Sequence, residues 1–242
     1  MKQNWNFINT GPNSGFINMQ TDLYLLDKAI KDKIDAILRV YSWDPPALST
    51  GRNQPHEGFN LALCEELGID IVKRPTGGRA LFHQGEITYS LVVRADILPG
   101  GNSVRESYKD ISGALIKACE YIGVKNISIS SSREPYTASR ACMAISTGAD
   151  LEIEGRKIAG SAQLRKKGYI MQHGSILLNQ DFALAARLFN VPPDSLKCIN
   201  LSSIINPLPV YDELADIIKE AFKKQFNIGF TSTKNQYLCI TF

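Results

Sequence analysis

The chain has 242 residues and a net charge of +3, from 27 lysines and arginines against 24 aspartates and glutamates. Apolar residues make up 44% and charged residues 21% of the sequence, which is ordinary for a globular protein with a core. The small basic excess argues against a nucleic-acid-binding protein, whose surface usually concentrates positive charge. No apolar run of about 18 residues occurs, so we expect no membrane-spanning segment.

The five cysteines are scattered, odd in number and without a Cys-x-x-Cys pair: Cys64, Cys119, Cys142, Cys198 and Cys239. This pattern argues against a disulfide framework and against a structural zinc site. Only three histidines occur, with no spacing typical of metal ligands, so we expect no metal site. The N-terminal stretch MKQNWNFINTGPNSG lacks the apolar core of a signal peptide. We therefore expect a reduced, cytoplasmic protein.

The first half of the chain predicts alternating helices and strands. The loop GPNSG should precede an amphipathic helix over 18–33, where apolar residues recur at steps of four and three. The stretch AILRVYSW, Ala36–Trp43, predicts a strand that Asp44-Pro45-Pro46 ends, and STGRNQPHEG after it predicts a polar loop. Further on we expect a short helix over 60–67 and strands over 69–74 and 87–93. The last of these is apolar almost throughout, as in a strand covered on both faces.

The second half predicts a helix over 107–122, a strand over 126–130 and a loop over 131–139. Residues 151–178 predict three antiparallel strands, with turns at Glu154-Gly155 and near Gly168. Helices over 181–189 and 212–226 should precede a final strand, TKNQYLCITF. The expected fold is α+β, a mixed or antiparallel sheet flanked by helices. We expect one domain over 1–242, with the alternative of a small C-terminal lobe from about residue 194.

The stretch RPTGGRALFHQGEITYSLVV, Arg74–Val93, puts a Gly-Gly pair between two arginines, with a histidine close behind. Glycine adopts backbone conformations with φ > 0 and lets a ligand lie against bare main chain. A tight turn is the plain alternative. Such a turn would leave Arg74, Arg79 and His83 unexplained, so Gly77 and Gly78 are candidate binding residues. No G-x-x-x-x-G-K sequence occurs, so this is no Walker-type phosphate loop.

A second stretch, GRKIAGSAQ from Gly155, surrounds Lys157 with small residues. Gly160, Ser161 and Ala162 on a strand would leave a groove beside the sheet. A lysine that projects into such a groove could hold a carboxylate or stabilise a thiolate. A solvated surface lysine is the ordinary alternative.

Cys142 follows Ser139-Arg140-Ala141 in a region without an apolar period. A cysteine in a loop near fixed cations has the environment of a nucleophile. By contrast, Cys119 lies on the apolar face of a predicted helix, and Cys64 is also expected in the core. His173, in Gln172-His173-Gly174-Ser175, is open to a structural or a functional interpretation.

Three blocks of the chain, in order, resemble the biotin/lipoate protein ligase and octanoyltransferase superfamily. INTGPNSGFINMQTDLYLL is similar to its first strand and helix, RPTGGRALFHQGEITYS to its acyl-site loop, and GRKIAGSAQLRKKGYIMQHGSILL to its lysine-bearing strand and the next strand. ATP-dependent ligases of the superfamily usually carry a third glycine and an aspartate where this chain has Arg79 and Gln84. The RPTGGRA form, with Cys142 fifteen residues before Lys157, more closely resembles the lipoate-ligase-related octanoyltransferases.

That resemblance implies transfer of octanoyl from acyl carrier protein to a lysine of the glycine cleavage H protein or a lipoyl domain. It implies Cys142 as the acyl-thioester nucleophile and Lys157 as the cation that stabilises its thiolate, with no cofactor. We expect the protein to be a monomer. The substrate-binding residues that it implies are Arg74, Thr76, Gly77, Gly78, Arg79, Ala80, His83, Gly160, Ser161, Ala162, His173 and Gly174. Backbone N–H groups near Gly77-Gly78 or beside Cys142 are candidate oxyanion donors.

Three other hypotheses remain at this stage. The chain could be an ATP-dependent lipoate ligase, which would use ATP and Mg²⁺ and make Cys142 incidental. It could be an octanoyl amidotransferase between carrier domains, or a non-catalytic carrier-binding module. The basic run Arg165-Lys166-Lys167 could steer an acidic carrier protein, with a solvated hairpin end as the alternative.

Overall fold

The structure, a computed structural model, describes residues 4–132, 139, 141–144 and 147–231. Within these ranges a large mixed sheet has eight strands. In spatial order they are β11 (Gly229–Thr231), β1 (Asn4–Asn13), β2 (Ala36–Trp43), β6 (Glu86–Arg94), β10 (Tyr169–Leu177), β9 (Arg156–Lys166), β8 (Leu151–Ile153) and β7 (Ile127–Ile129). A second sheet, β4-β3-β5, consists of β3 (Ala47–Thr50), β4 (Asp70–Lys73) and β5 (Leu81–His83).

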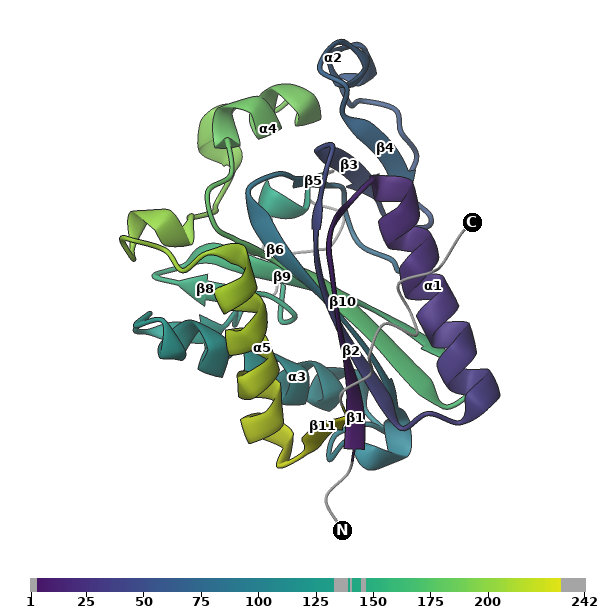
Figure 1. Ribbon diagram of the computed structural model, residues 1–242. Coiled ribbons are helices and arrows are strands. Elements are labelled where there is room, and N and C mark those ends of the chain that lie inside the picture. The colour runs from purple at the N-terminus through teal and green to yellow at the C-terminus, as the bar shows by residue number, and fades with distance from the viewer. Residues whose placement is uncertain (1–3, 133–138, 140, 145–146, 232–242) are drawn as a thin grey trace.

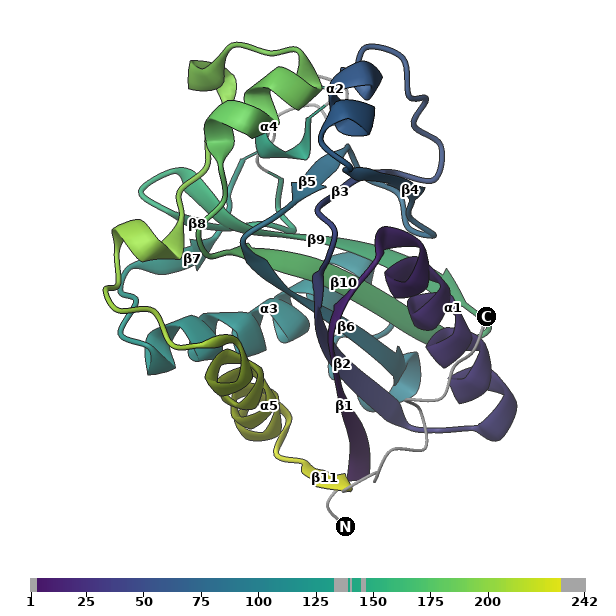
Figure 2. The ribbon, with the colours of Figure 1, turned by 45° about the horizontal axis from the view of Figure 1, so that its top comes forward.

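Five α-helices lie in the described ranges: α1 (Gly15–Asp32), α2 (Leu61–Glu66), α3 (Val104–Tyr121), α4 (Phe182–Phe189) and α5 (Tyr211–Phe226). Helix α1 lies along one face of the large sheet, and α3 and α5 lie on the opposite face (Figure 1). Figure 2 shows the small sheet with α2 and α4 at one end of the molecule, above the end of α1. None of the helices in these ranges is long and apolar enough to span a bilayer.

Two apolar layers cover the large sheet. Under α1, the side chains of Leu26 and Ala29 pack with Val92 and Met171 of the central strands. On the other face α3 and α5 share a larger core cluster with Tyr89. Every residue of β6 except Arg94 is buried, which confirms the prediction of a strand covered on both faces.

The predicted antiparallel strands over 151–178 are confirmed as β8, β9 and β10. Their turns have positive φ at Glu154 (50°) and Gly155 (73°), and at Lys167 and Gly168. In the register of the central strands, His173 lies opposite Ser90 of β6 and Ala162 of β9. Since neighbours along a strand alternate between faces, His173 and Ser175 point to the α1 side of the sheet.

Several local predictions were wrong. The stretch GPNSG was expected as a loop, but β1 continues to Asn13, because a register shift after Asn9 accommodates Gly11 with its positive φ. Helix α1 therefore begins at Gly15, with Ser14 as its N-cap. Strand β3 includes Ser49 and Thr50, which were expected in a loop, and β5 was not predicted. Both strands are too short to show an apolar period, and β3 pairs with β4 as well as with β5.

The predicted helices over 60–67, 107–122, 181–189 and 212–226 are confirmed as α2, α3, α4 and α5 with ends shifted by a few residues. The predicted final strand TKNQYLCITF and most of the predicted loop over 131–139 lie outside the described residues. Helix α5 contributes Leu214, Ile218 and Phe222 to the main core cluster. On that ground we propose that the segment after residue 194 belongs to the same domain as the rest.

Candidate active site

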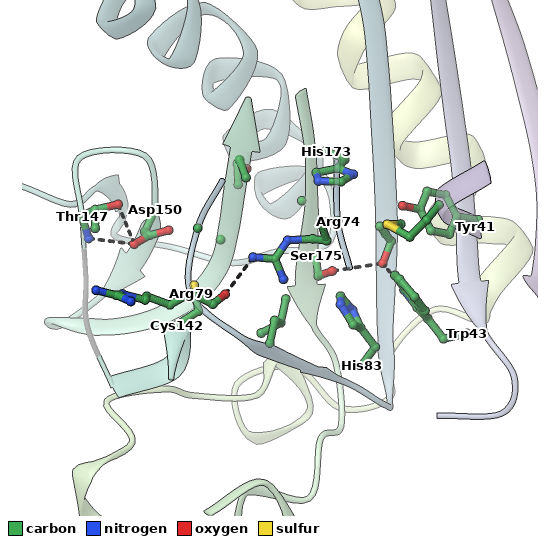
Figure 3. Close-up of a pocket in the computed structure, with 18 residues that line it drawn as sticks. Tyr41, Trp43, Arg74, Arg79, His83, Cys142, Thr147, Asp150, His173 and Ser175 are labelled. Atoms are coloured by element: carbon green, nitrogen blue, oxygen red, sulfur yellow. Dashed lines mark hydrogen bonds between the residues drawn. The ribbon is translucent and has the colours of Figure 1, made fainter. Parts of the chain in front are cut away.

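A pocket of about 650 Å³, its open mouth included, lies between the α1 face of the large sheet and the small sheet. Figure 3 shows Cys142, Arg79 and Asp150 toward one end of this pocket, and Tyr41 and Trp43 toward the other. Between the two ends its wall contains small residues of β9 and β10, namely Gly160, Ser161, Ala162, Gly174 and Ser175. The groove that these small residues predicted beside the sheet is therefore present.

Cys142 and Lys157 meet at one end of the pocket. The Nζ atom of Lys157 donates hydrogen bonds to Sγ of Cys142, at 3.1 Å, and to the carbonyl oxygen of Cys142, at 3.2 Å. The same Nζ lies 3.0 Å from Oδ1 of Asp150. Thr147 donates its backbone N–H and its hydroxyl to Oδ2 of Asp150, at 2.7 and 3.1 Å, so the carboxylate is held from both sides.

The environment of Lys157 keeps its side chain charged. Lys157 and Asp150 are only 3% and 2% exposed. Burial by itself would lower the pKa of Lys157, but the Asp150 carboxylate, followed by Cys142, outweighs burial and raises that pKa above its usual 10.5. An ammonium 3.1 Å from a sulfur favours the thiolate over the thiol. The ammonium of Lys157 thus lies between the Asp150 carboxylate and the Cys142 sulfur at the end of the pocket.

The four described cysteines differ in exposure, and Cys142 is the one that is not buried. Cys64 and Cys119 lie in the core, as the sequence predicted. Burial raises the pKa of Cys119 and of Cys198 to about 12, so these two remain thiols at neutral pH. Cys239 lies outside the described residues.

Backbone pairing fixes the position of Cys142. Ala80 and Ala141 form an isolated parallel bridge, and the backbone N–H of Cys142 donates to the carbonyl oxygen of Ala80 at 2.8 Å. Residues Cys142–Ala144 then form a short 3-10 turn. The segment that contains Cys142 is therefore held in place by backbone pairing with Ala80, at the end of the glycine-rich loop.

Two positions in the β9–β10 pair require glycine, because neighbouring atoms lie too close to leave room for a Cβ. A Cβ on Gly160 would lie 2.8 Å from Cε of Lys157 and 3.0 Å from its Nζ. A Cβ on Gly174 would lie 2.5 Å from the carbonyl oxygen of Gly160 and 2.9 Å from the ring of Tyr89. The lysine therefore reaches Cys142 across bare main chain at Gly160.

Arg74 braces the glycine-rich loop instead of pointing freely into the pocket. Its guanidinium donates to Ser49 and to the carbonyl oxygens of Gly77 and Arg79. Gly78 has a φ of 108°, so it needs to be glycine for its conformation. Its carbonyl oxygen also lies where a Cβ on Gly51 would be, so Gly51 needs to be glycine for this close approach. A Cβ on Gly77, by contrast, would meet nothing within 4 Å.

Thr76 and His173 connect the same loop to the large sheet. Oγ1 of Thr76 lies 2.7 Å from Nε2 of His173, and Nδ1 of His173 lies 3.0 Å from Oδ2 of Asp22 in α1. Arg39 and Tyr41 also donate to the Asp22 carboxylate, at 2.8 and 3.0 Å. Burial raises the pKa of Asp22, but Arg39 and His173 together outweigh it and lower that pKa below 3.8. His173 is thus both a pocket residue and part of a buried charged network.

The end of the pocket away from Cys142 contains a second polar network. Trp43 stacks on His83 with ring centroids 3.8 Å apart, and its Nε1 donates to Thr88 at 2.9 Å. His83 Nδ1 lies 2.6 Å from Oε1 of Glu86, which also accepts from Ser175. Burial, partly offset by Glu86, lowers the pKa of His83. These polar atoms bond one another within the wall, so Met19, Leu81 and the aromatic rings supply apolar surface to the pocket.

The structure brings most of the predicted residues to the pocket but distributes them differently from the expectation. Arg74, Gly78, Arg79, His83, Gly160, Ser161, Ala162, His173 and Gly174 line it together with Cys142. Thr76 and Ala80 lie behind its wall, fully buried, and Gly77 faces a neighbouring hollow. Of the basic run, Arg165 donates to Gly101, Ser103 and Ser107 at the start of α3, and Lys166 pairs with Asp27 at 2.6 Å.

Sequence reasoning missed Asp150. A signal for it was present, because an antiparallel hairpin that turns at Glu154-Gly155 brings the residues before Leu151 opposite Gly160. It also missed Thr147, Tyr41 and Trp43, for which the sequence offered no comparable pattern. No group of three or more His, Cys, Asp or Glu side chains arranged for a metal ion occurs in the part of the chain that is described.

Residues 14–224 match the lipoyl protein ligase A/B catalytic domain family. The chain belongs to this family. Among curated members, an octanoyltransferase LipM of Symbiobacterium thermophilum is 39% identical over 198 residues, covering 79% of this chain and 72% of that protein. An octanoyltransferase LipM of Staphylococcus epidermidis is 34% identical, over 95% of this chain and 90% of that protein.

Solved members of the family share the fold. A lipoate-protein ligase A bound with ATP superposes with a TM-score of 0.75 at 20% identity, covering 98% of this chain and 91% of that chain. A bipartite lipoate protein ligase of Thermoplasma acidophilum has a TM-score of 0.74 at 19% identity, covering 97% and 89%. The expected biotin/lipoate ligase-like architecture is therefore confirmed.

Proposed function

We propose that this protein transfers an octanoyl group from acyl carrier protein to a lysine of a lipoyl-dependent carrier, through a thioester on Cys142. The octanoyltransferase activity follows from the family and its curated relatives. The two carriers, the glycine cleavage H protein or a lipoyl domain as acceptor, and the residue roles are the proposal. The observation that supports it most directly is the 3.1 Å contact between Sγ of Cys142 and Nζ of Lys157.

In the first step the Cys142 thiolate attacks the carbonyl carbon of the octanoyl thioester. The new S–C bond forms, the bond to the carrier sulfur breaks, and the carrier thiolate leaves and takes a proton from water. One thioester replaces another, so the step is nearly isoenergetic and needs no ATP. Lys157 serves as a fixed positive charge beside the sulfur, and Asp150 acts on the sulfur only through Lys157.

In the second step the neutral amine of the acceptor lysine attacks the same carbonyl carbon. An amide bond forms, the bond to Sγ of Cys142 breaks, and the nitrogen loses one proton. The raised pKa of Lys157 leaves it protonated, so it is a poor base. We therefore assign the proton to the departing Cys142 sulfur, which passes it to water and becomes again the thiolate that starts the cycle.

The pocket suits the substrate tail. Burial contributes about 0.8 kcal/mol for each methylene, so the seven-carbon tail of octanoyl gains several kcal/mol on entering it. The carbonyl end would then face Cys142 and the tail would point toward Trp43 (Figure 3).

The proposal is tested by incubating the purified protein with octanoyl acyl carrier protein in the absence of ATP. Intact-mass measurement should show one octanoyl group on the enzyme, and Cys142→Ala should abolish it. Cys198→Ala, which removes a buried thiol close to the site, is the matched control and should retain the adduct. Acceptor protein added afterwards should remove the adduct and gain an amide.

A ligase would behave differently. It would modify the acceptor only when ATP is present and would tolerate Cys142→Ala. A binding module would form neither product. Absence of the adduct without ATP therefore overturns the proposed mechanism. We also propose that the enzyme is cytoplasmic and monomeric. Light scattering of the purified protein tests whether it is a monomer.

A further inference from the structure

A groove leads away from the Cys142 end of the pocket. The adjoining hollow shares Gly78, Thr147, Ser161 and Ala162 with the pocket itself. A third hollow shares Ser132 and Gly148 with that one and reaches Arg105 and Lys109 on α3. Because each hollow shares lining residues with the next, the three follow one another from Cys142 to the start of α3.

The inner part of the groove is lined mainly by backbone atoms and by polar side chains. Gly77, Gly148 and Ala149 present little more than backbone, and Ser161 and Gln163 add polar side chains. The half-buried ring of Tyr108 lies on its α3 side. Such a wall can bond amides and can hold a narrow, flexible chain.

The outer end of the groove is cationic. Arg105 and Lys109 are four residues apart, and so lie on the same face of α3. Both are exposed. Lys109 also pairs with Glu106 at 2.9 Å, and this pair is exposed enough for an incoming anion to compete with it.

We propose that this groove binds the 4′-phosphopantetheine arm of the acyl donor, with the phosphate at Arg105 and Lys109. The inference rests on the proposed function, because it concerns the donor of that reaction. When the octanoyl tail fills the pocket and its carbonyl lies at Cys142, the rest of the donor must leave the site by another route. That remainder carries two amides and ends in a phosphate, which is the order of chemistry along the groove.

The acceptor lysine fits the groove less well. A lysine side chain carries no amide and no negatively charged group. The two cations at the end of the groove would also repel it. The assignment also makes the carrier's prosthetic group, and not only its protein surface, a determinant of recognition.

The experiment compares three octanoyl thioesters as acyl donors to the enzyme, without carrier protein and without ATP. They are octanoyl-4′-phosphopantetheine, octanoyl-pantetheine, which lacks the phosphate, and octanoyl-N-acetylcysteamine, which lacks most of the arm. The rate of adduct formation on Cys142 is followed by intact mass. We expect the wild type to prefer the phosphorylated donor over octanoyl-pantetheine by about tenfold, the effect of one good charge-assisted contact.

The variant Arg105→Gln/Lys109→Gln should lose this preference and keep the wild-type rate with octanoyl-N-acetylcysteamine. Lys125→Gln, which removes an exposed cation just beyond the other end of α3, is the control and should keep the preference. A wild type that treats the two pantetheine donors alike, or a double variant that retains the preference, overturns the inference.

Calorimetric titration with 4′-phosphopantetheine itself separates this inference from the proposed function. If no thioester acylates the enzyme, the proposed function fails. Binding that the wild type shows and Arg105→Gln/Lys109→Gln lacks would still support the groove, and equal or absent binding in both proteins would overturn it. If all thioesters acylate Cys142 without regard to the phosphate, the function stands and the groove assignment falls.

Discussion

Asp150 lies 3.0 Å from Nζ of Lys157, in a place where both side chains are almost fully withdrawn from water. Two opposite charges in such a setting depend on each other. Removal of one leaves the other buried without a counter-ion, at a cost of about 3–5 kcal/mol unless the remaining group becomes neutral. The charge of Lys157, and through it the environment of the Cys142 sulfur, therefore depends on the Asp150 carboxylate.

The first prediction concerns Asp150→Asn. Without the carboxylate, burial favours the neutral amine of Lys157, and Cys142 loses its neighbouring positive charge. The sulfur then lacks the charge-assisted contact with the ammonium, so the rate of octanoyl adduct formation should fall by about tenfold. The measurement is single-turnover acylation by octanoyl acyl carrier protein. Glu154→Gln, an exposed change in the adjacent turn, should leave the rate intact, and an unaffected Asp150→Asn would remove Asp150 from the mechanism.

The second prediction concerns pH. The pKa of Lys157 is raised above 10.5, so its positive charge is present at lower pH and is lost only as pH rises through the folded value. Alkylation of Cys142 by iodoacetamide in the wild type should therefore show no fall between neutral pH and pH 10.5. In Asp150→Asn burial is no longer outweighed by the carboxylate, so Lys157 should lose its charge at lower pH and the profile should differ from that of the wild type within this range. Identical profiles for the two proteins would contradict the assigned ion pair.

The third prediction concerns Gly160→Ala. The added Cβ would lie 2.8 Å from Cε of Lys157, and the end of that side chain can move more readily than backbone. The fold should persist while the ammonium shifts away from Cys142, and acylation should fall on the order of 10²-fold, as for other small misplacements of reacting groups. Gly113→Ala, where the new Cβ meets only the Gln225 side chain, should retain the wild-type rate. Thermal melting monitors the fold of both variants.

The fourth prediction concerns stability. Asp22 is fully buried and accepts from Arg39, Tyr41 and His173. Asp22→Asn leaves Arg39 without its counter-ion, so the free energy of unfolding at pH 7 should fall by about 3–5 kcal/mol. Because the pKa of Asp22 is lowered, its contribution is present above pH 3.8 and is lost as pH falls through the folded value.

Urea denaturation of the wild type and Asp22→Asn at neutral and at acid pH checks this, and the difference between them should shrink in acid. Asp216→Asn serves as a control, since that carboxylate is 74% exposed and only 3.8 Å from its partner Lys219. A loss for Asp22→Asn no larger than for this control would show that the buried network contributes little.

The parts of the fold with strong periodicity were predictable. Helix α3 and the strands β8, β9 and β10 have regular apolar patterns and glycine-containing turns, so local chemistry and tertiary packing agree there. Strands β3 and β5 have three or four residues each and pair with segments distant in sequence. No local pattern encodes that pairing. Ser49 and Thr50 of β3 were predicted as loop because of their turn-forming neighbours, and no element was predicted for β5.

Some residues of the candidate site were likewise predictable from the sequence, and others were not. Cys142 and Lys157 stand out because a loop cysteine and a lysine among small residues are unusual. Asp150 is unremarkable in sequence, since an acidic residue before a strand is most often solvated. Its role comes from the hairpin register and from Thr147, which only the folded chain brings together with it. The network of Asp22 and His173 likewise joins residues 151 positions apart.

The bridge between Ala80 and Ala141 ties Cys142 to the glycine-rich loop that lines the pocket, where the proposed mechanism puts the acyl tail. A tail that pushes this loop outward would also carry the sulfur outward, so the fit of the hydrocarbon chain and the aim of the attacking atom are mechanically coupled. A poorly fitting acyl group would then be disfavoured twice, once by weaker burial and once by a misdirected sulfur.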